Sequence, residues 1–246
     1  MTHNLDNLHA RLAAVHASIQ AAAAHHGRPA EVVTLLAVSK TQPAQAIRAA
    51  AAAGQRRFGE NYLQEALAKM AALADLDLEW HFIGPLQSNK TRPVAEHFTW
   101  VHSVDRLKLA ERLSAQRPDT LPPLNVCLQV NISAETSKSG CSLSDLPALA
   151  HAVAALPRLR LRGLMAIPAP AEGREAQRQP FRRLREALEQ LNAGGLALDT
   201  LSMGMSDDLE AAIAEGATLV RVGSAIFGTR PAKPEHLPQS RGAAEQ

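Results

Sequence analysis

Apolar residues in this chain follow two patterns, which are short unbroken runs and stripes at helical spacing. The run from Val32 to Val38 is rich in β-branched residues and ends abruptly at the polar residues Ser39, Lys40 and Thr41. A run of this length, closed by polar residues, is typical of a strand buried on both faces. Further strands are predicted at residues 57–60, 79–84, 98–104, 124–132, 159–167, 200–203 and 218–222.

Segments with helical periodicity come before and between these runs. One stripe predicts a helix within residues 1–27, and its apolar positions, three or four apart, are Leu5, Leu8, Leu12, Val15 and Ile19. Further helices are predicted at 43–53, 61–70, 105–116, 143–156, 181–191 and 207–215. A polar loop is predicted at 87–90, after the third strand.

Eight strand and helix units in roughly 200 residues predict an α/β fold, a single-domain (β/α)8 TIM barrel with an extra N-terminal helix. The barrel domain is expected to span residues 1–230, and the Pro-, Ala- and Gln-rich residues 231–246 are expected to form a disordered tail. An open doubly wound sheet is the alternative, but no GxGxxG motif follows the first strand.

Composition narrows the classes of partner. The formal net charge is +2 and aromatic residues make up 3% of the chain, so a basic, aromatic surface for nucleic acid is not expected. Cys127 and Cys141 lack metal-ligand spacing, so we expect free thiols in a reducing compartment. The ten histidines are scattered, and neither a signal peptide nor an apolar run of about 18 residues is present. The sequence predicts a cytoplasmic protein that binds no metal, membrane or nucleic acid.

In a barrel, the residues that follow each strand gather at one mouth. The polar and glycine residues in these positions are Lys40, Asn61, Lys138, Ser206, Gly223 and Ser224. A lysine held there against apolar neighbours loses its proton more easily than a solvated one, and an unprotonated amine forms imines. A solvated lysine at the start of a loop is the simpler alternative.

The loops after the last two strands predict a phosphate site, because such loops often bind phosphate in barrels. Gly223 would let backbone N–H groups approach an anion closely. Ser206 precedes a helix, although it could be a plain N-cap whose neighbours Asp207 and Asp208 complement the helix dipole. An imine-forming lysine that faces a phosphate site suggests either a sugar-phosphate aldolase or a pyridoxal 5′-phosphate protein.

Arg221 helps to separate these two classes. It lies two residues before Gly223 on the same strand face, so its side chain can point into the barrel or towards its mouth. A guanidinium only donates hydrogen bonds, so beside a pyridine nitrogen it would keep that nitrogen unprotonated and weaken the cofactor as an electron sink. An arginine paired with an acid inside the barrel is the alternative.

Seven segments carry a more specific signal, and they are Leu36–Thr41, Phe58–Tyr62, Trp80–Lys90, Ser137–Gly140, Arg162–Pro168, Leu201–Asp208 and Arg221–Gly228. Together they resemble the pyridoxal phosphate homeostasis protein family over about residues 34–230. The resemblance implies a barrel like the N-terminal domain of alanine racemase, with Lys40 carrying pyridoxal 5′-phosphate (PLP) as an aldimine. It also implies that Arg221 faces the pyridine nitrogen, that Asn61 lines the ring, and that the phosphate is held by Ser206, Gly223 and Ser224.

The chain departs from the family at two positions. Family members commonly have lysine where this chain has Gln42, and often threonine at the position of Ser224. Neither change threatens cofactor binding. The loss of the lysine removes a possible secondary aldehyde acceptor, for which Lys138 remains a candidate.

The resemblance implies cofactor handling rather than turnover: binding PLP, limiting free aldehyde and passing the cofactor to apo-enzymes. A racemase needs a second acid or base opposite the lysine, and alanine racemase supplies a tyrosine from an extra domain of the partner subunit. Here the one tyrosine is Tyr62, and no such domain is expected after Arg230. A monomeric, non-catalytic PLP carrier is predicted, although Lys40 could support trace activity on amino acids. The alternatives are a PLP-dependent amino-acid racemase and a cofactor-free aldolase.

Overall fold

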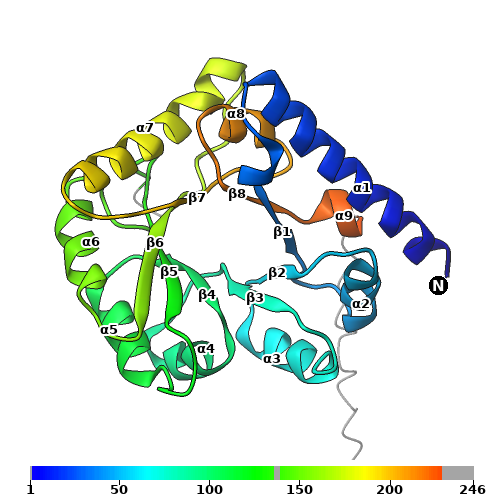
Figure 1. Cartoon of the computed structure of the whole chain (residues 1–246), viewed down its shortest axis with the longest axis horizontal. Coiled ribbons are helices and arrows are strands. Elements are labelled where there is room, and N and C mark those ends of the chain that lie inside the picture. Colours follow the sequence, from blue (N-terminus) through cyan, green and yellow to red (C-terminus); the bar gives the residue numbers. More distant parts are fainter. Residues whose placement is uncertain (1, 136–138, 229–246) are drawn as a thin grey trace, which may run out of the picture.

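The structure is a computed structural model that describes residues 2–135 and 139–228, with side chains described from residue 7 onward in the first helix. These residues form a closed barrel whose parallel strands follow one another in chain order (Figure 1). The strands are β1 (Thr34–Val38), β2 (Arg57–Glu60), β3 (Glu79–Phe82), β4 (Trp100–Val104), β5 (Leu124–Gln129), β6 (Leu159–Met165), β7 (Thr200–Ser202) and β8 (Leu219–Val222). The predicted (β/α)8 barrel is confirmed.

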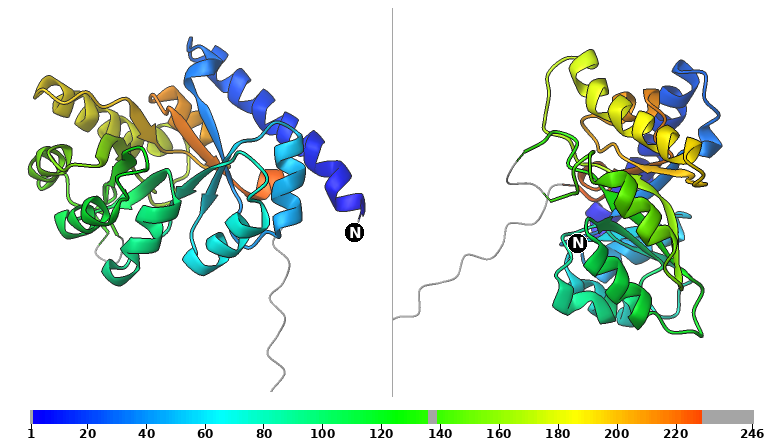
Figure 2. Two further views of the ribbon diagram at one scale, coloured as in Figure 1. Left: turned by 60° about the horizontal axis from the view of Figure 1, so that its bottom comes forward. Right: turned by 90° about the vertical axis from the view of Figure 1, so that its left-hand side faces the viewer.

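Helices form a layer around the outside of the barrel, as Figures 1 and 2 show. The α-helices of the described residues are α1 (Thr2–His25), α2 (Ala44–Ala52), α3 (Leu63–Ala72), α4 (Thr91–His97), α5 (Leu107–Gln116), α6 (Leu146–Ala154), α7 (Arg174–Ala193), α8 (Leu209–Ala214) and α9 (Ser224–Phe227). Two short 3-10 helices, η1 (Ala30–Val32) and η2 (Ser88–Lys90), precede β1 and α4.

Successive side chains of a strand point to opposite faces, so half of them meet the helices and half fill the barrel. The large apolar core combines residues of the helices with outward-facing strand residues such as Phe58 and Phe82. Inside the barrel the apolar residues form two small groups. One contains Leu36, Ile83 and Leu219, and the other contains Trp100, Cys127 and Met165. Polar side chains, among them those of His102, Ser202 and Arg221, are also buried inside the barrel.

The N-terminal helix α1 packs on the outside of the barrel against α2, α8 and α9. The described members of its predicted apolar stripe are all buried, namely Leu8, Leu12, Val15 and Ile19. Arg11 adds a hydrogen bond of 2.7 Å from its Nε to the carbonyl oxygen of Ile226 in α9. Because β1 pairs with β8, this helix covers the seam where the two ends of the barrel sequence meet.

Two helical segments differ from the prediction. A polar loop was predicted at 87–90, but η2 forms there and α4 follows it. The helix α4 has only seven residues and buries few apolar side chains, so its sequence shows little helical periodicity. α7 begins at Arg174 rather than at 181, although Pro180 lies inside it. A proline removes one helical hydrogen bond, and packing of the helix against the barrel compensates for that loss.

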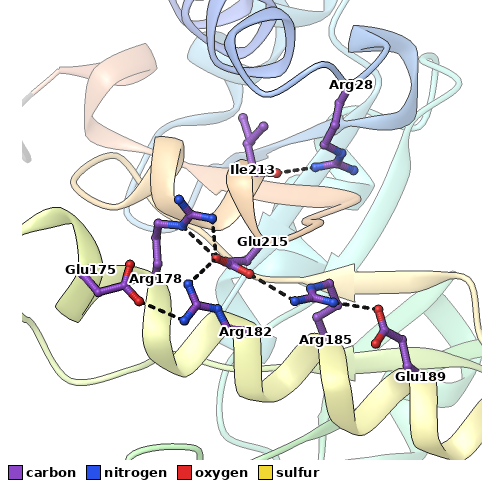
Figure 3. Close-up of polar contacts among 8 residues, drawn as sticks. All are labelled: Arg28, Glu175, Arg178, Arg182, Arg185, Glu189, Ile213 and Glu215. Atoms are coloured by element: carbon purple, nitrogen blue, oxygen red, sulfur yellow. Dashed lines mark hydrogen bonds and ion pairs between the residues drawn. The ribbon is translucent and has the colours of Figure 1, made fainter.

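Figure 3 shows polar contacts that hold α7 against the end of α8. The buried carboxylate of Glu215 accepts hydrogen bonds from Arg178 at 2.7 Å, Arg182 at 3.3 Å and Arg185 at 3.4 Å. Burial by itself would raise the pKa of Glu215, but the bonds from Arg178 and Arg182 outweigh it and hold the pKa below its ordinary value. These three arginines therefore anchor α7 to the end of α8.

Cys127 and Cys141 are free, as predicted, and both are buried. Burial raises the pKa of the Cys127 thiol to about 12 and that of Cys141 to about 11, so both remain protonated at neutral pH. In the part of the chain that the structure describes, no helix has the length and apolar character needed to cross a bilayer. The tail predicted at 231–246 lies outside the described residues.

Candidate functional site

A pocket of about 230 Å³ opens at the carboxyl ends of β1 and β8. Its lining residues are Val38, Lys40, Gln42, Met205, Ser206, Asp207, Arg221, Gly223, Ser224 and Gly228. This set includes five of the six predicted site residues, namely Lys40, Ser206, Arg221, Gly223 and Ser224. They come from opposite ends of the chain and lie together because β1 and β8 pair in parallel.

Buried polar residues fix the end of β1, from which Lys40 projects. The hydroxyl of Ser39 donates a hydrogen bond of 2.6 Å to Oε1 of Glu60, at the end of β2. Nζ of Lys69, in α3, donates to the Ser39 carbonyl at 2.7 Å and to the same Glu60 oxygen at 2.8 Å. Burial raises the pKa of Glu60 even though Lys69 and Ser39 oppose this shift. The hydrogen bonds of Ser39 with Glu60 and Lys69 therefore hold the backbone in place just before Lys40.

The residue after Lys40 has an uncommon backbone conformation. Thr41 has φ of 64°, in the left-handed region, which is rare for β-branched residues. Its N–H donates a hydrogen bond of 2.5 Å to Oε1 of Glu65, which also accepts one from Lys69 at 2.5 Å. Strained residues of this kind persist where surrounding contacts hold them, and they are frequent at functional sites.

Gly223 brings the end of β8 close to the end of β1. A Cβ at this position would lie 3.2 Å from the carbonyl oxygen of Val38 and 3.3 Å from its Cβ. Any larger residue would therefore press against the strand that carries Lys40. The short helix α9 starts at the next residue, Ser224, and the first N–H groups of a helix have no partners within it.

Asp208 shapes the loop between β7 and α8. Its Oδ1 accepts a hydrogen bond of 2.6 Å from the N–H of Met205, and it occupies the N-cap position of α8. Burial raises the pKa of this carboxyl group. The alternative in which Ser206 caps the helix is therefore wrong, because Ser206 lies two residues earlier and is exposed at the pocket. Asp207 also lines the pocket.

Arg221 is buried in the mouth of the barrel with 4% of its surface exposed. Its Nη1 donates to Oγ of Ser202 at 2.8 Å, and its Nη2 donates to the carbonyl oxygen of Ala166 at 2.9 Å. Burial lowers the pKa of Arg221 to about 10, so the group is still charged at neutral pH. Both hydrogen-bond acceptors are uncharged, which differs from the acid pair considered from the sequence. A guanidinium has five donor hydrogens, so donors remain for a ligand in the pocket.

Asn61 is not among the residues that line this pocket. It follows β2, and its backbone lies so close to Gly84 that a Cβ there would be 2.5 Å from the Asn61 carbonyl oxygen. Its Oδ1 is buried and has no hydrogen-bond partner. Unpaired buried acceptors are uncommon, so this atom fits an interaction with a bound donor. Lys138, the other predicted candidate, lies outside the described residues.

A larger pocket of about 480 Å³ lies at the opposite mouth, where the strands begin. Its charged residues are paired: Arg57 lies 3.2 Å from Glu79, and Arg162 lies 2.8 Å from Asp199. In barrels this mouth usually serves stability, whereas ligands bind at the carboxyl mouth. The smaller pocket is therefore the candidate site.

One group of possible metal ligands occurs among the described residues, His25, His26 and Glu210 on the outside of the barrel. Their ligand atoms lie within 4.8 Å of one another, which is looser than a bound ion requires. None of the three lines the candidate site.

The fold and the pocket together define a class of protein, a (β/α)8 barrel with a pocket at its carboxyl mouth that a lysine and a glycine line. The family model "Alanine racemase, N-terminal domain" matches residues 10–231. The pyridoxal phosphate homeostasis protein of Pseudomonas aeruginosa is 70% identical over 219 residues, which are 89% of this chain and 94% of that protein. The protein of that name from Escherichia coli K12 is 59% identical over 222 residues, 89% and 95% of the two chains. This chain belongs to the alanine racemase N-terminal domain family and, within it, to the pyridoxal phosphate homeostasis proteins.

Solved structures agree with this assignment. PipY of Synechococcus elongatus PCC7942 without PLP has a TM-score of 0.81 and 43% identity, covering 90% of this chain and all of PipY. The PipY structure with PLP bound has a TM-score of 0.80 and 42% identity over the same shares. Alanine racemase from Corynebacterium glutamicum has a TM-score of 0.68 at 18% identity, over 92% of this chain and 62% of the racemase, which shows a shared barrel fold. The family resemblance predicted from the sequence is confirmed.

Proposed function

We propose that this protein binds pyridoxal 5′-phosphate at the carboxyl mouth of its barrel and serves PLP homeostasis. The observation that carries the proposal is one pocket lined by a lysine amine, serine hydroxyls, a close backbone approach at Gly223 and a buried arginine. The related proteins named above are PLP homeostasis proteins, and PipY binds PLP within the same fold.

The residues of the pocket fit the chemistry of this cofactor. When bound, PLP supplies an aldehyde that condenses with amines, together with a pyridine ring and a phosphate. Lys40 offers the amine for covalent attachment, and Arg221 offers donors to the ring nitrogen. Asn61 does not line the pocket, but its buried Oδ1 has no hydrogen-bond partner, and we propose that it accepts a hydrogen bond from the cofactor. The donors that fit the phosphate belong to Ser206, Gly223 and Ser224.

We further propose that the protein holds the cofactor without substantial turnover. A two-base racemase needs an acid or base opposite Lys40. Tyr62 is the one tyrosine of the chain, its side chain is 55% exposed, and it does not line the pocket. A guanidinium at the ring nitrogen also weakens the electron sink on which racemisation depends. These observations favour a carrier over a racemase.

An absorption spectrum of the purified chain, with and without added PLP, tests the proposal. We expect a visible protein-bound band that survives desalting in the parent and in Lys108→Ala, and that is lost in Lys40→Ala. Lys108 is an exposed lysine on α5 and serves as the matched control. A band that persists in Lys40→Ala would overturn the assignment of Lys40.

Two further outcomes would favour other functions. Robust turnover of a single amino-acid enantiomer would overturn the carrier function in favour of a racemase, and a Tyr62→Phe variant would then show whether that tyrosine takes part. A colourless protein that borohydride traps only in the presence of a sugar phosphate would indicate an aldolase.

A further inference from the structure

A line of hydrogen-bonded polar side chains runs from Arg221 through the inside of the barrel to the opposite mouth. Nη1 of Arg221 lies 2.8 Å from Oγ of Ser202, which lies 2.7 Å from Nδ1 of His102. Nε2 of His102 lies 2.8 Å from Nδ1 of His81, and Nε2 of His81 lies 2.8 Å from Oε1 of Glu79. The line therefore links β8, β7, β4 and β3, which are spread around the barrel.

These side chains occupy an interior that barrels usually fill with branched apolar residues. Ser202, His102 and His81 have no exposed surface. The ring of Trp100 is stacked on His81, with 5.2 Å between centroids and 6° between the planes, so the orientation of that imidazole is fixed. Buried polar groups are costly unless each has a partner, and in this line every ring nitrogen has one.

The chemistry of the two ends gives the line a single direction. The Glu79 carboxylate can only accept, so His81 carries its hydrogen on Nε2 and donates it to Glu79. Nδ1 of the neutral His81 ring then accepts from Nε2 of His102, and Nδ1 of the neutral His102 ring accepts from the Ser202 hydroxyl. Arg221 can only donate, and a lone pair of Ser202 accepts from it. Burial lowers the pKa of both histidines, which keeps them neutral, as this arrangement requires.

We propose that Ser202, His102 and His81 are positioning residues that hold the Arg221 guanidinium in one orientation towards the ring nitrogen of the bound cofactor. His102 keeps the Ser202 hydroxyl hydrogen turned away, so that a lone pair of Ser202 always faces Nη1 of Arg221. Glu79 ends the line and selects the tautomers. The proposal rests on the proposed function, because the orientation of Arg221 matters for binding only if PLP occupies the pocket.

Three serine variants of the full-length protein test this role in the cofactor-bound state. Ser202→Ala removes both hydrogen bonds at that position, whereas Ser202→Thr retains the hydroxyl. Ser103→Ala is the matched control, because Ser103 is also buried, lies next to His102 on β4, and has an Oγ without a hydrogen-bond partner. The measurements are the dissociation constant for PLP, the position of the Lys40-dependent absorption band, and the melting temperature.

We expect Ser202→Ala to weaken PLP binding about fivefold to tenfold, which corresponds to the net contribution of one ordinary hydrogen bond, and to shift the absorption band. Ser202→Thr should recover the parent values to within about twofold, and Ser103→Ala should leave both unchanged. If Ser202→Ala lowers only the melting temperature, with affinity and band as in the parent, the line is structural and the positioning role is overturned.

Histidine ¹⁵N NMR of the cofactor-free parent tests the direction of the line independently of PLP. We expect both His81 and His102 to be neutral with hydrogen on Nε2, and Ser202→Ala to shift the Nδ1 resonance of His102 towards that of a nitrogen without a donor. A hydrogen on Nδ1 of either ring would overturn the proposed arrangement. A parent that binds no PLP but gives the expected NMR spectrum would overturn the proposed function and with it the positioning role, while the ordered line itself would stand.

Discussion

The two mouths of the barrel carry pockets that differ in size and in the partners of their arginines. At the amino mouth, where the strands begin, the pocket has about 480 Å³, and its two arginines form ion pairs with Glu79 and Asp199. At the carboxyl mouth the pocket has about 230 Å³, and its arginine, Arg221, donates hydrogen bonds to two uncharged oxygens. Arg221 therefore keeps donors for a ligand. The chemistry of the lining, rather than the volume, favours the smaller pocket as the ligand site.

The carboxyl groups near the two mouths differ in the direction in which their pKa values are shifted. Burial raises the pKa of Glu60 and of Asp208, which lie near the carboxyl mouth. At the amino mouth a hydrogen bond from His81 lowers the pKa of Glu79, and bonds to Asp199 outweigh its burial and lower its pKa as well. Ion pairs that favour the charged form stabilise the fold at the amino mouth, whereas burial raises the pKa of carboxyl groups near the candidate site, as is common at functional sites.

The largest effect is expected from Lys69→Met, which removes the cation beneath the carboxyl mouth. The carboxylate of Glu60 would then be buried without its counter-ion, so we expect the free energy of unfolding to fall by about 3–5 kcal/mol. Urea denaturation measures this change. The double variant Lys69→Met/Glu60→Gln should recover at least half of it, since no buried charge remains. A single-variant cost below about 1 kcal/mol would contradict this account of the site's support.

The next prediction compares how much one arginine at each mouth contributes to PLP affinity. Arg221→Ala removes a buried charge and the donors that face the pocket, so we expect PLP affinity to fall about 100-fold. Arg162→Ala is the matched change at the amino mouth and should leave affinity within about twofold. Titration of the absorption band with PLP gives both values. Equal losses in the two variants would remove the distinction between the mouths.

A smaller effect is expected from Asp199→Asn, which breaks the pair with Arg162. This pair is partly exposed, so the free energy of unfolding at pH 7 should fall by about 1 kcal/mol, with PLP binding unchanged. Because the pKa of Asp199 is lowered in the folded state, its contribution is present above the unfolded pKa and is lost as the pH falls through the folded one. The difference between variant and parent should therefore begin to shrink below about pH 4 and vanish only below the lowered folded pKa. A difference that persists there would contradict the ion pair as its source.

Glu60 should show the opposite pH dependence. Its pKa is raised in the folded state, so its favourable contribution is complete below the unfolded pKa of about 4.3 and is lost as the pH rises through the folded pKa. In Glu60→Gln this decline of stability with rising pH should disappear. Denaturation at several pH values measures the slope, and carboxyl-carbon NMR should show Glu60 titrating above its ordinary range and Glu79 below it.

The last prediction is that neither cysteine thiol reacts in the folded protein. Cys127 packs with Trp100, which lines the amino-mouth pocket, whereas the N–H of Cys141 bonds to the carbonyl of Gln129 at the end of β5. With pKa values of about 12 and about 11, neither thiol should react with a chromogenic thiol reagent within minutes at pH 8. Denaturant should expose both. Rapid reaction of one thiol in the native protein would show that its end of the barrel opens.

Much of the fold could be predicted from short-range patterns. The apolar run before Lys40 predicts β1 to within a few residues, and the stripe of α1 predicts its buried face, because both depend on residues close in sequence. The start of α7 at Arg174 could not be predicted, since Pro180 suggests a boundary and the contacts that override it come from Glu215 in another element. α4 was missed because so short a helix depends on packing more than on its own periodicity.

The sequence by itself determined that a lysine, two serines and Gly223 follow strands of one barrel, and hence that they share a mouth, because strand order and polarity are set by local pattern and chain connection. Only the tertiary structure decided which polar side chains meet inside. Ser202 and His102 are 100 positions apart in the sequence, yet Oγ of Ser202 lies 2.7 Å from Nδ1 of His102. Alternation along a strand shows which side chains face the interior, but closure and stagger of the barrel decide which of them come within hydrogen-bond distance.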